Sequence, residues 1–270
     1  MQRNTTRPFL KWAGGKYRLL QRLTPHLEGN KLIEPFVGSG AVFLNLPFDK
    51  YLVGDINPDL INLYEILKNE QDSFIAYCQS FFTADNNQKD TYLKFREEFN
   101  SGLVGRRRAA LFLYFNRHGF NGLCRYNKSG GYNVPFGRYK KPYFPAKEMK
   151  FFYQRAKKVS FVCGDFVNLM NRARKGDLVY CDPPYVPLSP TSSFTSYASQ
   201  GFSYDQQVEL AYRAKRLANR GVRVVISNHD NEITRRIYED AEIESFYVKR
   251  FISCEGANRR DAKELFAIYR

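Results

Sequence analysis

The sequence predicts a mixed α/β fold in which helices cover both faces of a mostly parallel β-sheet that is interrupted by one basic insertion. Short apolar segments alternate with segments of helical period, as expected when helices connect successive parallel strands. The 270 residues, of which 43% are hydrophobic and 26% charged, suffice for one large domain with an insertion or for two modest domains. This composition is typical of a globular protein and excludes a disordered or fibrous chain.

Six short apolar segments are the expected strands, and the first two end near Gly or Asp residues. They span 31–37, 51–56, 159–163, 177–182, 222–227 and 264–269. The clearest helical period lies at 204–219, and Gly221 is its stop signal. The apolar side of that helix would consist of Val208, Leu210, Ala211, Ala214, Leu217 and Ala218.

The positive charge is concentrated in residues 101–160. Seven Arg and seven Lys stand there against the single acid Glu148, so this segment holds +13 of the chain's +15. It also contains thirteen of the 43 aromatic residues, an interleaving that suits phosphate contact and base stacking. A merely solvated basic face is the alternative, but such faces normally include acids. We interpret the runs 106–108 and 258–260 as phosphate-contacting or solvated, and 111–115 as buried core.

The sequence disfavours several other classes of protein, namely membrane proteins, secreted proteins, disulfide-bonded proteins and metalloproteins. The longest apolar run, 109–115, is far shorter than the roughly 20 residues that span a bilayer, and the first residues do not resemble a secretory signal. We therefore expect a cytoplasmic protein. The five scattered cysteines form no C-x-x-C pair, and the three histidines stand outside any Cys/His cluster, which predicts neither disulfides nor a metal site. We assign no catalytic role to His229. The cysteines are Cys78, Cys124, Cys163, Cys181 and Cys254.

A glycine-rich turn follows the first expected strand, in Glu34-Pro-Phe-Val-Gly-Ser-Gly. Gly38 and Gly40 would let the backbone approach a ligand at a helix N-terminus. Asp55 ends the next expected strand, a spacing that suits a carboxylate that binds ribose hydroxyls. The third glycine of a dinucleotide fingerprint is replaced by Phe43, which disfavours NAD or FAD. Without further motifs, an alternative is that the glycines only allow close packing and that Asp55 only caps a helix.

The most informative motif is Asp182-Pro183-Pro184-Tyr185, directly after an apolar strand. Open α/β sheets bind ligands at the carboxyl ends of their strands. Two prolines stiffen the turn and supply no N–H, so that a carboxylate and free carbonyl oxygens face outward as acceptors. They could accept the two hydrogens of an exocyclic amino group on a purine, while Tyr185 stacks on the base. A rigid turn without function is the alternative, which the co-occurring glycine loop and Asp55 disfavour.

Five motifs together resemble the Dam-type DNA adenine-N6 methyltransferases, in the same order and over nearly the whole chain. They begin at Phe9 (FLKWAGGK), Glu34 (EPFVGSG), Asn121 (NGLCRYN), Asn133 (NVPFGRYKKP) and Asp182 (DPPY). The order of cofactor loop, recognition insertion and acidic turn is that of the alpha group of amino methyltransferases. The resemblance implies a Rossmann-like S-adenosylmethionine-dependent methyltransferase sheet with a mostly helical basic DNA-recognition insertion.

The resemblance also assigns residues to the cofactor and to the target base. Asp55 would bind the ribose of S-adenosylmethionine, and the 34–40 loop would surround its methionine part. The turn at 182–185 would hold the target adenine, with Asp182, Pro183, Pro184 and Tyr185 as catalytic residues. The implied cofactor-binding set is Trp12, Lys16, Glu34, Pro35, Phe36, Gly38, Ser39, Gly40, Asp55, Ile56, Asp165, Phe166 and Asp182.

Similar enzymes recognise GATC in double-stranded DNA. Lys11 matches the residue that contacts the first G·C pair, whereas Leu123, Arg125 and Tyr139 match those that read the last part of the site. Arg125 suits bidentate contact with guanine. His118 and Phe120 replace tyrosines of the best-known relatives, so a hydroxyl at position 120 is absent. The implied DNA-binding set is Lys11, Phe120, Asn121, Leu123, Arg125, Asn133, Pro135, Arg138, Tyr139 and Lys140.

The expected function is therefore methyl transfer from S-adenosylmethionine to N6 of adenine in GATC by base flipping, leaving S-adenosylhomocysteine. Residues 1–56 and 145–270 would form the catalytic domain and 57–144 the recognition domain. We expect a monomer that uses no metal, binds no membrane and is associated with the nucleoid, in replication-linked marking, mismatch repair or restriction-modification. A catalytically silent DNA-binding module, or methyl transfer to RNA or a protein amide, are the alternatives.

Overall fold

The computed structural model describes residues 5–186, 202–248 and 262–270, so that Cys254 and the 258–260 run lie outside the described residues. Packing divides the chain into two compact units. This division does not test the predicted functional boundaries at residues 56 and 145, which stay a prediction. The first unit consists of Met1–Arg22, Val37–Pro47 and Val53–Gly164, and the second of Leu23–Phe36, Phe48–Leu52 and Asp165–Arg270.

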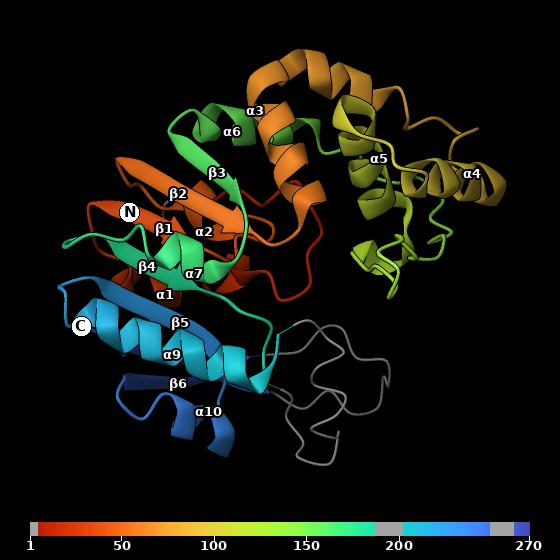
Figure 1. The fold of residues 1–270 in the computed structure, drawn as a ribbon. Helices are drawn as coiled ribbons and strands as arrows, with labels where there is room; N and C mark the ends of the chain where they lie inside the picture. Colours follow the sequence, from red (N-terminus) through yellow and green to blue (C-terminus); the bar gives the residue numbers. More distant parts are fainter. Residues whose placement is uncertain (1–4, 187–201, 249–261) are drawn as a thin grey trace. The chain divides into compact units, whose positions relative to one another are not determined.

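Seven described strands form one sheet in the order β3-β2-β1-β4-β5-β7-β6 (Figure 1). The strands β1, β4 and β5 are parallel neighbours, with Val179 opposite Val224, whereas β7 is antiparallel to both β5 and β6. This confirms a mixed α/β fold. The bounds are β1 Lys31–Glu34, β2 Lys50–Asp55, β3 Val159–Cys163, β4 Leu178–Cys181, β5 Arg223–His229, β6 Glu242–Val248 and β7 Ala262–Tyr269.

Two strand predictions differ from the structure. The first strand ends at Glu34, because Pro35 lacks the N–H that a ladder requires. The strand β6 was not predicted, because only Phe246 of its seven residues is fully buried and its apolar pattern is therefore weak. The other five predicted strands are present within one or two residues of their expected ends.

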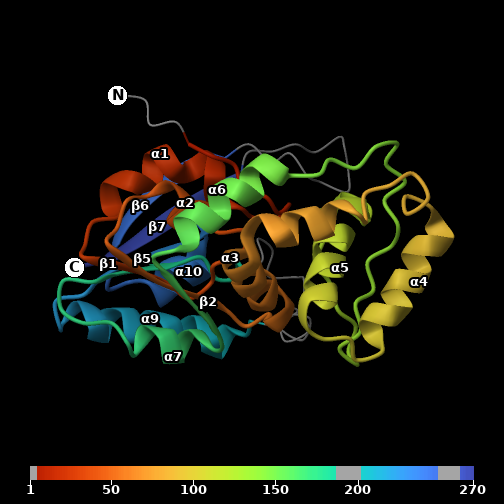
Figure 2. The same cartoon turned by 90° about the horizontal axis from the view of Figure 1, so that it is seen from above.

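In the second unit, α9 (Tyr204–Ala218) packs along β5 and beside α7 (Phe166–Met170), as Figure 2 shows. Ser203 and Gln206 form a capping box at its start. The prediction that Val208 faces the core is wrong, because Val208 is 42% exposed and Gln207 is buried instead. The other helices of this unit are α1 (Leu20–Leu23, shared with the first unit), η2 (Thr24–His26) and α10 (Glu232–Ile237).

The first unit contains a helical region in which α5 packs against both α3 and α4 (Figure 2). Residues 111–115 of α5 are buried among aromatic rings, as predicted. No helix in the described ranges combines the length and apolarity needed to cross a membrane. The remaining helices are η1 (Lys16–Leu19), α2 (Ala41–Asn45), α3 (Pro58–Gln79), α4 (Lys89–Asn100), α5 (Gly105–His118), η3 (Phe120–Gly122) and α6 (Ala146–Ala156).

Candidate cofactor loop, acidic turn and DNA-reading surface

Residues 37–40 of the glycine-rich loop lie in the first unit, and two of them must be glycine. Gly38 and Gly40 have φ of 46° and 77°, which side-chain-bearing residues rarely adopt. A Cβ at position 38 would lie 2.7 Å from Nε1 of Trp12, so the indole is packed directly against this backbone. The Tyr64 hydroxyl donates to the Gly38 carbonyl oxygen at 2.5 Å and fixes the turn. The structure thus brings Trp12 and the glycine loop together.

Asp55 ends β2 and is tied to the same loop. One carboxylate oxygen accepts from the Gly38 amide at 3.1 Å, and the other accepts from the Asn57 amide at 3.0 Å. Each oxygen retains a further lone pair for a ligand hydroxyl. Burial raises the pKa of the Asp55 carboxyl above its ordinary value, although contacts with backbone N–H groups partly oppose this shift. Such a perturbed carboxyl in a glycine-lined turn is typical of a binding site.

The first unit contains three further predicted cofactor residues, Ile56, Ser39 and Lys16. Ile56, beside Asp55, is 71% exposed, which is unusual for an isoleucine. This exposed apolar side chain is suited to cover the face of a base. Ser39 is buried in the loop. Lys16 is also buried, and its ammonium donates to the Gly14 carbonyl oxygen at 2.7 Å, which closes the 13–16 turn.

The second unit holds the other predicted cofactor residues. Phe36 stacks on Phe166 with ring centroids 5.5 Å apart, and so these two form one aromatic surface. Glu34 and Pro35 are buried at the end of β1. Asp165 caps α7, since its side chain accepts from the Val167 amide at 2.7 Å. Its carboxylate therefore has a structural role whether or not it also contacts a ligand.

The acidic turn at 182–185 follows β4 in the second unit, at the carboxyl end of a parallel strand as predicted. Its backbone is held from two neighbouring elements. The Gln207 side chain of α9 donates to the Pro184 carbonyl oxygen at 2.8 Å. The Asn228 side chain of β5 accepts from the Val186 amide at 3.1 Å and donates to Gln207 in turn. The turn is thus fixed by a buried amide network.

Tyr185 is held by its hydroxyl and by its ring. The hydroxyl donates to Glu264 of β7 at 3.1 Å, and the ring meets His229 edge-on with centroids 4.8 Å apart. Burial and the negative charges of Asp182 and Glu264 raise the pKa of Tyr185 well above its ordinary value, so the hydroxyl stays protonated. A ring fixed in this way can offer its face to a base.

A short hairpin in the first unit presents Arg125. Tyr126 and Tyr132 pair across it, and the Asn133 amide donates to the Arg125 carbonyl oxygen at 3.1 Å. The exposed guanidinium donates to the side-chain and backbone oxygens of Asn133, at 2.8 and 3.1 Å. Arg125 is therefore oriented before any ligand binds, which reduces the entropy that a bidentate contact would cost.

Three segments of the first unit meet around Tyr139. Its hydroxyl accepts from the Asn121 amide at 2.9 Å, and the Lys11 ammonium lies 4.4 Å from the centre of its ring. Burial lowers the pKa of Lys11, as does the charge of Arg117. Phe120 and Leu123 are exposed beside Asn121. Predicted DNA-reading residues that are distant in the sequence are thus neighbours.

The remaining predicted DNA-binding residues lie within 135–140, on the returning part of the same loop. The Phe120 amide donates to the Pro135 carbonyl oxygen at 2.8 Å. Arg138 and Lys140 are exposed, and Asn87 binds the Tyr139 and Lys140 carbonyl oxygens at 2.8 and 3.3 Å. Asn87 therefore anchors the backbone that carries these cations.

Comparison with known proteins identifies the family. The model of the D12 class N6 adenine-specific DNA methyltransferases matches residues 12–252. The chain belongs to this family. A DNA adenine methylase of Vibrio cholerae serotype O1 is 50% identical over 265 residues, which cover 97% of this chain and 96% of that one. DNA adenine methylases of Escherichia coli K12 and Serratia marcescens are each 49% identical, covering 98% of this chain and 95% and 98% of theirs.

An adenine-specific DNA methyltransferase acts on DNA, which confirms the predicted substrate class and enzyme class. The two alternatives, a catalytically silent DNA-binding module and methyl transfer to RNA or a protein amide, are not the activity of this family.

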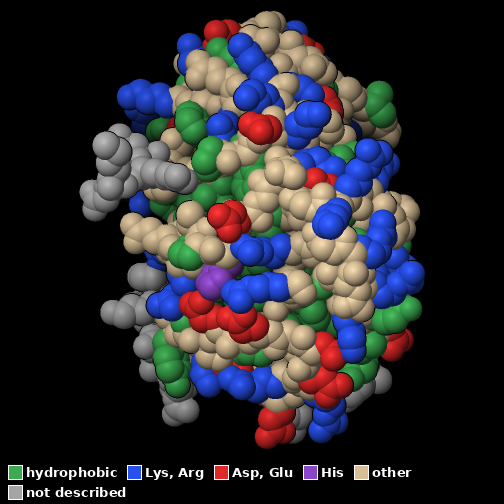
Figure 3. Space-filling model, turned by 90° about the vertical axis from the view of Figure 1, so that its left-hand side faces the viewer, with side chains coloured by type: hydrophobic (Ala, Val, Ile, Leu, Met, Phe, Trp, Pro, Cys, Tyr) green, Lys and Arg blue, Asp and Glu red, His purple; other side chains and the backbone are tan. Residues whose placement is uncertain are grey.

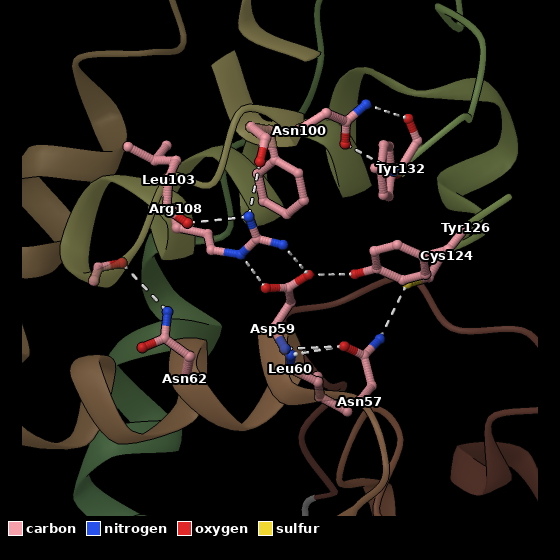
Figure 4. Close-up of polar contacts among 12 residues, drawn as sticks. Asn57, Asp59, Leu60, Asn62, Asn100, Leu103, Arg108, Cys124, Tyr126 and Tyr132 are labelled. Atoms are coloured by element: carbon pink, nitrogen blue, oxygen red, sulfur yellow. Dashed lines mark hydrogen bonds and ion pairs between the residues drawn. The ribbon is translucent and has the colours of Figure 1, made fainter. Parts of the chain in front are cut away.

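The prediction that Arg106, Arg107 and Arg108 contact phosphate or water is wrong for Arg108 and incomplete for the others, because each is paired with a carboxylate. Arg106 meets Glu70 at 2.7 Å, and Arg107 binds Glu98. Arg108 makes a two-pronged contact with the buried Asp59, which also accepts from the Tyr126 hydroxyl at 2.6 Å (Figure 4). In this methyltransferase the run holds helices together.

His118 is a buried packing residue of α5. Its buried ring stacks on Tyr114 with centroids 3.9 Å apart, and Nδ1 lies 3.0 Å from the Tyr114 carbonyl oxygen. Burial lowers the pKa of His118 to about 4, so the ring is neutral at pH 7. This histidine therefore adds no charge to the surface of the methyltransferase.

Gln207 and Asn228 hold the acidic turn but are not among the predicted site residues, and no catalytic role was predicted for His229. The His229 Nδ1 lies 2.7 Å from the Val186 carbonyl oxygen, next to that turn. A signal was available, since the polar run Ser227-Asn-His-Asp interrupts the apolar strand that pairs with β4. Polar residues at the end of a buried strand indicate support for a site.

Proposed function

We propose that this methyltransferase transfers a methyl group from S-adenosylmethionine to N6 of adenine in double-stranded GATC, and leaves S-adenosylhomocysteine. The observation that carries the proposal is the acidic turn at 182–185, which stands at the carboxyl end of β4 on a network of buried amides. The family supplies the reaction class, and the turn supplies acceptors of the right kind for an adenine amino group.

The residues of the glycine loop fit a nucleoside cofactor. Gly38 and Gly40 leave the backbone without Cβ atoms, and Asp55 offers carboxylate lone pairs for ribose hydroxyls. Ile56 offers an exposed apolar side chain for the base, and Trp12 closes the loop. S-adenosylmethionine supplies a methyl group that its sulfonium has already activated, so the protein needs no metal for this step.

The role of the chain is to make the adenine amino group nucleophilic and to align it. The N6 lone pair is delocalised into the purine ring. When the Asp182 carboxylate and the Pro183 carbonyl oxygen accept the two hydrogens, the nitrogen can become pyramidal and direct its lone pair at the methyl carbon. The carbon–sulfur bond would break as the new carbon–nitrogen bond forms, its electron pair would stay on sulfur, and N6 would then lose one proton to solvent. Tyr185, fixed by Glu264 and His229, stacks on the base. The amino group is inaccessible within the DNA duplex, so the adenine must first be flipped out of the base stack.

The reading of GATC rests on the loop surface of the first unit. Arg125 would bind guanine O6 and N7, Lys11 would contact the first pair, and Asn121 would enter the gap that the adenine leaves. The exposed Phe120 and Leu123 beside Asn121 support such an insertion. In this proposal, residues 57–144 form the recognition domain and the remainder forms the catalytic domain, from which Lys11 adds one DNA contact. In this proposal the enzyme is a monomer in solution and acts on DNA in the cytoplasm.

A methyl-transfer assay with labelled S-adenosylmethionine tests the proposal. The wild-type enzyme should methylate a GATC duplex and lose activity when any base pair of the site is changed. Asp182→Ala should lower kcat by about a hundredfold or more, the usual loss when a transition-state hydrogen bond is removed. Binding of the GATC duplex, measured by fluorescence anisotropy, should be retained. A near wild-type rate in Asp182→Ala would contradict the assignment of that residue.

A further inference from the structure

The side chain of Asn116, near the end of α5, joins two chain segments that carry proposed DNA-reading residues. Its Oδ1 accepts from the Lys11 amide at 2.9 Å, and its Nδ2 donates to the Lys11 carbonyl oxygen at 2.7 Å. The same Nδ2 donates to the Gly122 carbonyl oxygen at 3.2 Å. Asn116 is only 3% exposed, so that loss of these bonds would leave backbone groups unsatisfied in the interior.

The two joined segments are in direct contact. Gly122 has φ of 65°, and a Cβ there would lie 2.5 Å from both Cβ and Cδ of Lys11. Only glycine permits this approach. Tyr139 then connects the outer ends, since its hydroxyl accepts from the Asn121 amide and its ring lies under the Lys11 ammonium. The position of Lys11 is therefore fixed relative to Asn121 and Leu123.

We propose that Asn116 is a positioning residue for sequence recognition, which sets Lys11 and the 121–125 loop at the separation of the two ends of the DNA site. This inference rests on the proposed GATC reading. Asn116 faces the Lys11 backbone and the Gly122 carbonyl oxygen, so it acts through the residues that contact bases. Direct readout depends on the placement of donors against base edges, so a shift of one segment weakens recognition at both ends.

The chain offers a matched control. Asn45 binds the same N-terminal segment five residues earlier, with the same three kinds of bond. Its Oδ1 accepts from the Thr6 amide at 2.7 Å, and its Nδ2 donates to the Thr6 and Ala41 carbonyl oxygens at 3.0 and 2.8 Å. Asn45→Ala therefore removes a similar pair of bonds to the N-terminal segment that does not reach the 121–125 loop. Asn45 is half-buried, and its third bond returns to its own helix α2.

The experiment measures kcat and KM for methylation of three hemimethylated duplexes, in which N6-methyladenine already occupies one strand of the palindrome, so that only the other strand can accept a methyl group. Counted along that acceptor strand, the sites are GATC, GATC with its first base pair replaced, and GATC with its last base pair replaced. In Asn116→Ala, the preference for GATC should fall about tenfold or more against both altered sites, mainly through KM. Lys11→Ala should lose preference at the first pair only. In Asn45→Ala the preference should be unchanged, although its melting temperature falls.

Gly122→Ala gives an independent test should Asn116→Ala fail to fold, because the added Cβ separates the two segments while the Asn116 side chain is retained. This Cβ would lie 2.5 Å from Lys11 and also 3.0 Å from the Asn116 carbonyl oxygen. It should also lose preference at both ends. Unchanged preference in a folded Asn116→Ala or Gly122→Ala enzyme, with wild-type discrimination intact, would overturn the positioning role alone. Failure of the wild-type enzyme to distinguish the duplexes would overturn the proposed GATC reading, and the inference with it.

Discussion

The arginines at the start of α5 and the cations of the 120–141 loop belong to one basic stretch of sequence, but they have different partners. Arg106, Arg107 and Arg108 each meet a carboxylate from α3 or α4. Among the described residues, the loop cations form no ion pair with a carboxylate, and Arg125 is held by Asn133 instead. The loop cations are Arg125, Lys128, Arg138, Lys140 and Lys141.

This difference shows that counting charged residues along a segment of the sequence overestimates how much unpaired positive charge that segment presents at the surface. The acids that neutralise the arginines precede the basic stretch and are brought to it by the packing of α3 and α4 on α5. Basic and acidic side chains are also interspersed on the face of the molecule that Figure 3 shows. Cations without carboxylate partners remain available for phosphates and bases, so they are the better candidates for DNA contact.

The largest effect is expected at the buried pair. Arg108→Ala would leave the Asp59 carboxylate buried with the Tyr126 hydroxyl but without a cation, and it would also remove bonds to the Phe99 and Leu103 carbonyl oxygens. Loss of one partner of a buried ion pair costs about 3–5 kcal/mol. The free energy of unfolding in urea should fall by this amount.

Arg107→Ala is the control for this prediction, because its pair with Glu98 is 41% and 33% exposed on the two side chains. Loss of such a surface pair costs about 0–1 kcal/mol. If the two variants were equally stable, Arg108 would not be the structural arginine that its contacts indicate. The preference for GATC should remain in any Arg108→Ala enzyme that is folded.

A smaller effect, on recognition and not on stability, is expected for Arg125→Ala. The side chain is exposed, so the melting temperature should change little. Loss of a bidentate contact with guanine should reduce discrimination at one base pair by about 1–3 kcal/mol. Arg125→Lys keeps the charge without the planar fork and should recover affinity but not discrimination. Equal kcat/KM ratios for matched and altered duplexes in wild type and Arg125→Ala would contradict this role.

The same contrast explains what the sequence could predict. Six of the seven described strands, the two left-handed glycines of the 34–40 loop and the acidic turn depend on local patterns, so they could be located from neighbouring residues. The partners of Arg108 and the support from Gln207 and Asn228 could not, because Asp59 is 49 residues from Arg108 and Asn228 is 42 residues from Val186. The error at Val208 has a local cause, since helical spacing from Leu210 and Ala211 places position 207, not 208, on the buried face. The Gln207 amide can be buried there because it binds the Pro184 carbonyl oxygen.

The smallest expected effect concerns nonspecific affinity. Lys140 is exposed at the end of the reading loop, so in Lys140→Ala one phosphate contact should be lost and the slope of log Kd against log salt should decrease by about one. Arg106→Ala removes the same charge, but this charge is already paired with Glu70 and lies 4.4 Å from the centre of the Tyr77 ring. Its slope should equal that of wild type. A smaller slope in Arg106→Ala, measured by anisotropy over a salt series, would show that the paired arginines also contact DNA, and the distinction between the two sets would fail.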